Sequence, residues 1–133
     1  MTARRSLLVL LALAVLAVAL VGCSSPERVA VTEGRIPGSL PDDFPIPSDA
    51  TVGRSVVDRG SHRSEVEFGL SRGVDEAARF YLVNLVGSGY VVESAAGDDA
   101  GWSIRFSRDT LRGSVVIEAA RSGSAVVVSI NRS

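Results

Sequence analysis

Apolar and polar residues follow regular spacings along most of this chain, and those spacings predict its elements. Six segments have the composition or the alternation of β-strands: residues 51–58, 64–70, 90–95, 101–108, 113–120 and 124–131. Residues 74–86, between the second and third segments, repeat apolar positions at helical spacing. This order favours an α+β fold, with a single antiparallel sheet of about six strands and one helix packed on one face.

The same spacings assign each side chain to a face. The helix should turn one stripe toward the sheet: Val74, Ala77, Ala78, Tyr81, Leu82 and Leu85. The strands should turn these residues toward the helix: Val66, Phe68, Leu70, Trp102, Ile104, Phe106, Val115, Ile117, Ala119, Val126, Val128 and Ile130. We expect Ser71 or Gly73 to cap the helix and Gly87-Ser88-Gly89 to end it.

Two apolar sets point away from this predicted core. One is Phe80 and Val83 on the helix, and the other is Val57, Val91, Val116 and Val127 on the open face of the sheet. A cluster of exposed apolar residues can mark a contact site, so either set could bind a protein partner or a second copy of the chain. The alternative is that loops or the proline-rich segment cover them, since single exposed apolar residues are common.

The first 22 residues have the organisation of an export signal. Arg4 and Arg5 precede an unbroken apolar run over residues 7–21. The run is shorter than the roughly 20 residues that cross a bilayer core, so an uncleaved membrane anchor is only the alternative.

Leu20-Val21-Gly22-Cys23 resembles the bacterial lipobox, the recognition sequence of the lipoprotein signal peptidase. The resemblance implies cleavage before Cys23, acyl chains such as palmitate on its sulfur, and a lipid anchor on the extracytoplasmic face of the cell membrane. Cys23 is the only cysteine, so no internal disulfide can form. Two or more acyl chains give durable anchoring. Ordinary secretion after cleavage at Ala19 is the alternative.

The remaining 111 residues suffice for one domain. Residues 23–49 are rich in proline and glycine and are predicted to form a tether, and residues 50–133 the α+β domain. Extended, residues 24–40 would reach roughly 50 Å. The prolines of residues 41–47 alternate around Phe44 and Ile46, so this part should lie along the domain and bury both side chains. A proline-rich peptide ligand is the alternative.

Charge argues against several functions. Every basic residue is arginine, and residues 23–133 carry 12 arginines against 15 acidic residues. A weakly acidic domain is a poor candidate for nucleic acid, and charge alone should not hold it on anionic lipid.

The residues with chemical potential are few. His62, the only histidine, lies in a predicted polar turn with Asp58, Ser61 and Ser64 nearby in sequence, where no positioned nucleophile is expected. A metal site is not expected, because typical zinc sites need several His or Cys ligands. The acidic pairs Asp42-Asp43 and Asp98-Asp99 should be solvated.

Three carboxylates, Glu65, Glu67 and Glu118, could share the open sheet face. A glycosidase would need such a pair beside a cleft. We instead expect a solvated face that Arg105 helps to neutralise, and no enzyme. No cofactor is expected beyond the covalent lipid on Cys23.

A broader resemblance covers about 90 residues. The prolines, two strands, a helix with Phe80-Tyr81 and Leu85, and then Gly89-Tyr90 opening a strand are similar to small bacterial lipoproteins of uncharacterised function. The resemblance implies a fold and a location. We therefore expect a membrane-anchored, non-catalytic binding or accessory module of the cell envelope. The alternative is a carrier of a small apolar ligand or lipid, held between helix and sheet near Tyr81, Trp102 and Phe106.

Overall fold

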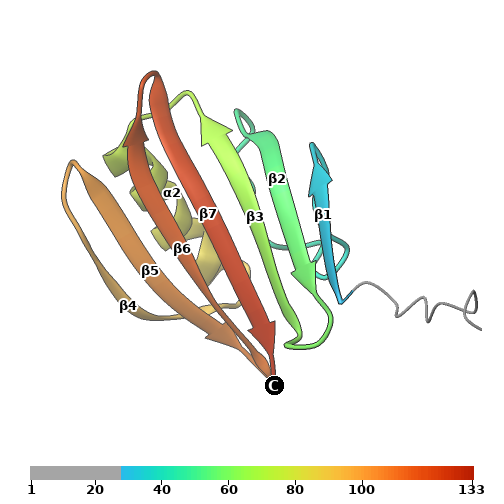
Figure 1. The fold of residues 1–133 in the computed structure, drawn as a ribbon. Coiled ribbons are helices and arrows are strands. Elements are labelled where there is room, and N and C mark those ends of the chain that lie inside the picture. Colours follow the sequence, from blue (N-terminus) through green and yellow to red (C-terminus); the bar gives the residue numbers. More distant parts are fainter. Residues whose placement is uncertain (1–27) are drawn as a thin grey trace, which may run out of the picture.

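Seven antiparallel strands form one sheet in the computed structural model, which describes residues 28–133 (Figure 1). The predicted signal peptide, lipobox and Cys23 lie outside the described residues. In chain order the elements are β1 (Val29–Glu33), β2 (Thr51–Asp58), β3 (Arg63–Leu70), α2 (Val74–Gly87), β4 (Val91–Gly97), β5 (Gly101–Arg108), β6 (Leu111–Ala120) and β7 (Gly123–Arg132). The α+β class and the single antiparallel sheet are confirmed, and the sheet has one strand more than the six expected.

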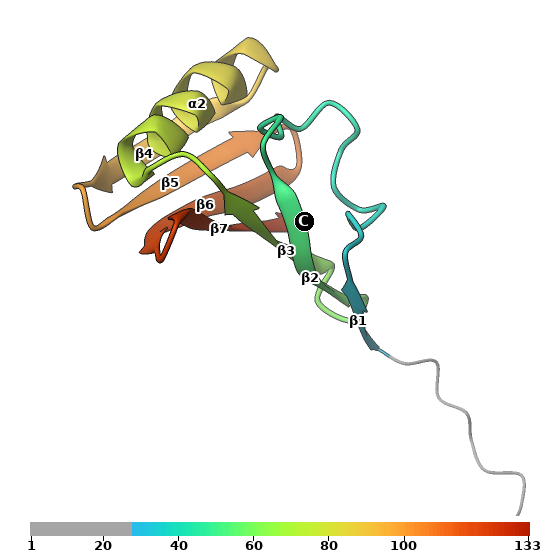
Figure 2. The ribbon, with the colours of Figure 1, turned by 90° about the horizontal axis from the view of Figure 1, so that it is seen from above.

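The strand order is β1-β2-β3-β7-β6-β5-β4. The last strand of the chain therefore lies in the middle of the sheet and joins a β1-β2-β3 half to a β6-β5-β4 half. Helix α2 contacts strands β4 to β7 on one face of the sheet, which we call the inner face (Figure 2). Nearly all of the residues predicted to face the helix are buried there; Ala119 is exposed and Trp102 is half-buried.

The helix begins and ends where its sequence predicts. Gly73 precedes it in extended conformation, although no side chain caps the first turn. Asp75 and Glu76 suit the positive end of the helix dipole. At the other end, Gly89 has a φ of +82°, a left-handed conformation that glycine adopts without strain.

The structure corrects the predicted tether. Residues 29–33 form β1, which pairs with β2 from Val29 opposite Asp58 to Glu33 opposite Arg54. The following residues, 34–50, which we call the strap, run back over the inner face beside α2 (Figure 2). Leu40 and Phe44 of the strap are each only 4% exposed, and Ile46 is half-buried. The burial of Phe44 is confirmed, and the folded domain begins near residue 29 rather than at residue 50.

The structure also corrects the position of Val57. Strand β2 bulges between Val52 and Ser55, so one extra residue is inserted relative to β3. A bulge reverses the alternation of faces beyond it. Val57 consequently pairs with the buried Ser64 on the inner face, and Val56 takes its place on the open face, opposite Glu65.

Candidate functional site

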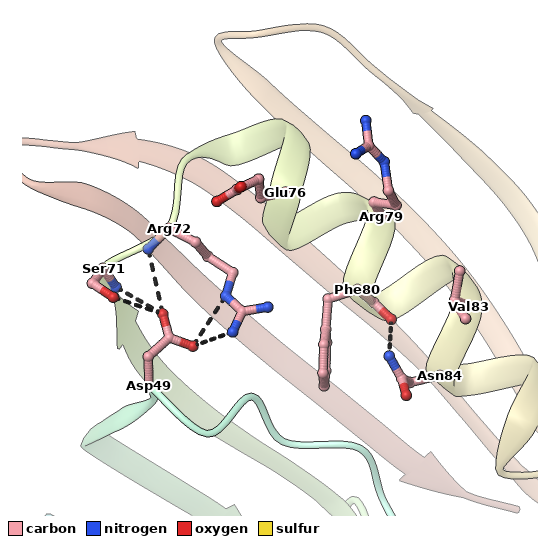
Figure 3. A pocket seen from close by; sticks show the side chains of 8 residues that line it. All are labelled: Asp49, Ser71, Arg72, Glu76, Arg79, Phe80, Val83 and Asn84. Carbon is pink, nitrogen blue, oxygen red and sulfur yellow. Dashed lines mark hydrogen bonds and ion pairs between the residues drawn. The ribbon is translucent and has the colours of Figure 1, made fainter.

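An open groove of about 710 Å³ runs along the solvent-facing side of α2, beside the connection from β3 (Figure 3). Phe80, Val83 and Asn84 line it from the helix, and Ser71 and Arg72 line it from the connection. The strap contributes Asp49, and the charged side chains of Glu76 and Arg79 complete the lining. Three separate parts of the chain therefore build one site.

Asp49 ties the strap to the start of the helix. Its carboxylate accepts hydrogen bonds from the backbone N–H and the hydroxyl of Ser71, at 3.1 and 2.9 Å. The backbone N–H of Arg72 donates to the same oxygen at 3.3 Å, and the Arg72 guanidinium donates to the other oxygen at 3.0 and 2.6 Å. The guanidinium and the Ser71 hydroxyl hold the pKa of Asp49 well below its usual range. This charge-assisted contact through two guanidinium nitrogens holds the Arg72 side chain in one position.

The fixed arginine lies against an aromatic ring. The guanidinium carbon of Arg72 is 5.2 Å from the ring centroid of Phe80, within cation–π distance. Phe80 also meets Tyr81 edge-on, with 5.3 Å between ring centroids. Asn84 donates from its side-chain nitrogen to the Phe80 carbonyl at 2.7 Å, one turn along the helix. Phe80 is thus half-buried and held in place, whereas Val83 is 65% exposed.

Phe80 and Val83, predicted from sequence as a contact pair, do line the same groove. The sequence did not indicate Asp49 and Arg72, which are separated by 23 positions and lie in segments that looked like a tether and a turn. No local spacing links them, because their contact depends on how the strap crosses the sheet.

The predicted valine patch on the open face does not assemble. Val116 and Val127 are direct partners on β6 and β7. Val91 pairs with Ser107 of β5, four residues along that strand from the Ser103 that pairs with Val116. With Val57 on the inner face, only two of the four valines are neighbours. Serines occupy the centre of the open face, where Ser114 pairs with Ser129.

Two of the three predicted open-face carboxylates, Glu65 and Glu67, each contact an arginine, and Glu118 lies on β6 opposite Gly101 of β5. Glu65 lies 3.3 Å from Arg63 and accepts a hydrogen bond from Ser129 at 3.1 Å. Glu67 lies 3.2 Å from Arg54. Arg105, the expected neutralising residue, instead lies opposite Ser114.

The β2–β3 turn does not assemble a Ser-His-Asp arrangement. His62 occupies this turn with a φ of +53°. The Asp58 carboxylate accepts from the turn itself, at 2.7 Å from the Ser61 hydroxyl and 2.8 Å from the Gly60 amide.

Aromatic rings fill the space between α2 and the sheet. The Phe44 ring reaches in from the strap, with centroid distances of 6.3 Å to Tyr81, 5.8 Å to Tyr90 and 5.6 Å to Phe106. Tyr81 and Phe106 are completely buried. The Tyr81 hydroxyl has no hydrogen-bond partner among the described residues, and burial raises its pKa.

A second clamp holds the strap near Phe44. The Arg108 guanidinium donates to both carboxylate oxygens of Asp43, at 2.6 and 2.9 Å, and its carbon lies 4.2 Å from the ring centroid of Tyr90. The Arg108 hydrogen bonds lower the pKa of Asp43. The strap is therefore held by Asp43 and Asp49, on either side of its buried phenylalanine.

Within residues 28–133, no group of three or more His, Cys, Asp or Glu side chains is placed to hold a metal ion. No helix in this range has the length and hydropathy required of a membrane span. Comparisons with protein-family models, with curated proteins and with solved structures found no match.

Proposed function

We propose that this protein is a lipid-anchored, extracytoplasmic binding module of the cell envelope, without catalytic activity, and that the groove along α2 is its contact site. The anchor part of the proposal rests on the lipobox-like Leu20-Val21-Gly22-Cys23 and on the single thiol. The binding part rests on one observation: Arg72 is fixed by Asp49 against Phe80, in a groove of about 710 Å³.

That arrangement suits a segment of a partner protein. Contact sites are enriched in aromatic residues and arginine. An arginine already held by a carboxylate loses little side-chain freedom on binding, which lowers the cost of association. Phe80 and Val83 offer apolar surface, and the Arg72 guanidinium and the Asn84 side chain offer donors to backbone carbonyls or a carboxylate of the partner.

The filled interior favours this function over the carrier of an apolar ligand. A carrier needs several hundred Å³ of enclosed space. Here Phe44, Tyr81, Tyr90 and Phe106 pack their rings into the region between α2 and the sheet. An apolar ligand would first have to displace the strap and both of its ion pairs.

The anchor is tested by mass spectrometry of the protein purified from its own membrane. We expect the chain to begin at Cys23 and to carry acyl chains, and a Cys23→Ala variant should remain as an uncleaved, unacylated precursor. A mature chain with a free thiol, or with a different first residue, would contradict the anchor.

The groove is tested by photo-crosslinking from Val83 and from Val91, in separate variants. These positions are matched in exposure, at 65% and 63%, but Val83 lies in the groove and Val91 on the open face of an edge strand. We expect a discrete adduct from position 83 that Arg72→Ala or Phe80→Ala removes, and none from position 91. Adducts from position 91 alone would move the contact site to the sheet.

A further inference from the structure

Arginines gather at the end of the sheet where the described chain begins. The start of β1, the β2–β3 turn and the end of β7 meet there (Figure 1). Arg59 donates its backbone N–H to the Arg28 carbonyl at 2.8 Å, and Arg132 donates its own to the His62 carbonyl at 3.3 Å. We call the four exposed arginines of this region the arginine corner: Arg28, Arg59, Arg63 and Arg132.

Three acidic residues lie near the four arginines of the corner: Asp58, Glu65 and Asp109, the last in the β5–β6 turn beside the end of β7. Asp58 lies in the turn, where its carboxylate accepts hydrogen bonds from Gly60 and Ser61. Glu65 pairs with Arg63 at 3.3 Å; the Arg63 side chain is exposed and Glu65 is half-buried, so water and salt screen the pair in part. The corner keeps a net positive charge.

The opposite end of the sheet carries the reverse charge. The β4–β5 turn lies at that end. The first turn of α2 lies beside it, because the Trp102 indole at the start of β5 donates to Asp75 at 3.3 Å. Acidic residues predominate at this end: Asp75, Glu76, Asp98, Asp99 and Glu118, with Arg79 and Arg121 as the exposed basic residues. The long axis of the sheet thus runs from a basic corner to an acidic end.

The strand beside the arginine corner starts close to the proposed anchor. Six residue steps separate Cys23 from Val29. A fully extended chain spans at most about 3.6 Å per residue, so the Cα atom of Val29 lies within about 22 Å of the Cα atom of Cys23. This is less than half of the reach that the expected tether would have allowed. The arginine corner is consequently kept near the lipid headgroups, where arginines within a Debye length of about 10 Å interact strongly.

We propose that the arginine corner docks on an anionic lipid surface and orients the domain on the membrane, an inference that rests on the proposed anchor at Cys23. An anionic membrane surface attracts arginines placed close to it. The acyl chains and the arginine charges act together, because the short segment between Cys23 and Val29 keeps the arginine corner at a high effective concentration near the headgroups. Docking leaves the acidic end, with Asp49 and Arg72 of the groove, facing away from the membrane toward a partner.

The docking is tested with a synthetic lipid in place of the acyl chains on Cys23. Residues 23–133 are coupled through the Cys23 thiol, the only one in the chain, to a maleimide lipid in vesicles of phosphatidylcholine with or without phosphatidylglycerol. Hydrogen–deuterium exchange then reports on the β2–β3 turn, residues 59–62, and on the β4–β5 turn, residues 98–100. We expect slower exchange of the first turn only on vesicles that contain phosphatidylglycerol, and no slowing in 0.5 M salt.

Two variants of equal net charge provide the control. Arg59→Glu with Arg63→Glu reverses the corner, and Arg79→Glu with Arg121→Glu makes the same change at the other end; all four side chains are exposed. Losing two arginine charges near the surface lowers the docked-to-undocked ratio by about thirtyfold, and reversing them lowers it further. The first variant should therefore lose the slow exchange of residues 59–62, and the second should keep it.

Equal exchange on the two vesicle types, or retention of the effect in the Arg59/Arg63 variant, would overturn the docking. So would slower exchange at residues 98–100 in place of residues 59–62. Because the synthetic lipid replaces cellular acylation, a negative result here refutes the docking alone, and the mass of the native protein decides the anchor separately.

Discussion

Phe44→Ala should unfold the domain far more readily than its place in a proline-rich segment suggests. The side chain is 4% exposed and lies 5.6 to 6.3 Å, between ring centroids, from three other aromatic rings. Truncating a buried phenylalanine to alanine costs about 3–5 kcal/mol, and aromatic pairs add about 0.5–1.5 kcal/mol each beyond their buried area. We therefore expect a loss of about 4 kcal/mol, a large share of the roughly 5–15 kcal/mol that stabilises a typical domain.

Urea denaturation followed by circular dichroism measures this loss. The transition midpoint should fall while its slope stays constant, because the surface exposed on unfolding hardly changes. The thermal midpoint should fall by about 15 °C or more. Phe44→Leu keeps most of the apolar volume, so its transition midpoints should lie between those of Phe44→Ala and the unmodified protein.

Ile36→Ala provides the matched control. Ile36 belongs to the same segment but is 44% exposed, so its loss should change stability by no more than about 0.5 kcal/mol. If the free energy of unfolding of Phe44→Ala were within 1 kcal/mol of that of the unmodified protein, the strap would not be part of the core. Its burial between α2 and the sheet would then be refuted.

Three further predictions follow from single contacts. Tyr81→Phe should keep or raise stability by about 1 kcal/mol, since it deletes a buried hydroxyl that has no partner among residues 28–133; a clear loss in the thermal midpoint would reveal a missed hydrogen bond. Gly113→Ala should destabilise by about 1–3 kcal/mol in urea, because a Cβ there would overlap the ring of Phe106; an unchanged midpoint would refute that contact. Asp49→Asn should lower the free energy of unfolding at pH 7. The pKa of Asp49 is depressed in the folded state, so its carboxylate stabilises the fold above the unfolded-state pKa near 3.9, and this contribution disappears as the pH falls toward the folded-state pKa. The free energy of unfolding of the variant should therefore fall less steeply than that of the unmodified protein below about pH 4. Equal acid sensitivity of the two proteins in a pH series would show that the Arg72 contact contributes nothing.

Elements with strong local patterns were predictable from the sequence. Residues 51–58 and 101–108 are strands with the predicted bounds, and the apolar stripe of residues 74–86 does face the sheet. Residues 29–33 were not predicted as a strand. Val29 and Val31 remain largely exposed, so this segment lacks the alternation of buried apolar and exposed polar residues that marks a strand. Only their pairing with β2, which is not local, makes them a strand.

The remaining errors also come from non-local effects. Alternation fails beyond the bulge in β2, because one inserted residue exchanges the faces of Val56 and Val57. Four valines on one predicted face suggested a patch, but strand order and register separate Val91 from Val116. In the groove, helical spacing located Phe80 and Val83, whereas the pairing of Asp49 with Arg72 required the path of the strap.

The central position of β7 has a consequence for synthesis. Until its ten residues are available, β3 and β6 both present unpaired edges, and the two halves of the sheet share no hydrogen-bonded strand. The sheet therefore cannot close until residues 123–132 are available, and pairing over such long sequence separations is slow. A chain cut before residue 123 would keep β3 and β6 as unpaired edges, and such edges favour aggregation.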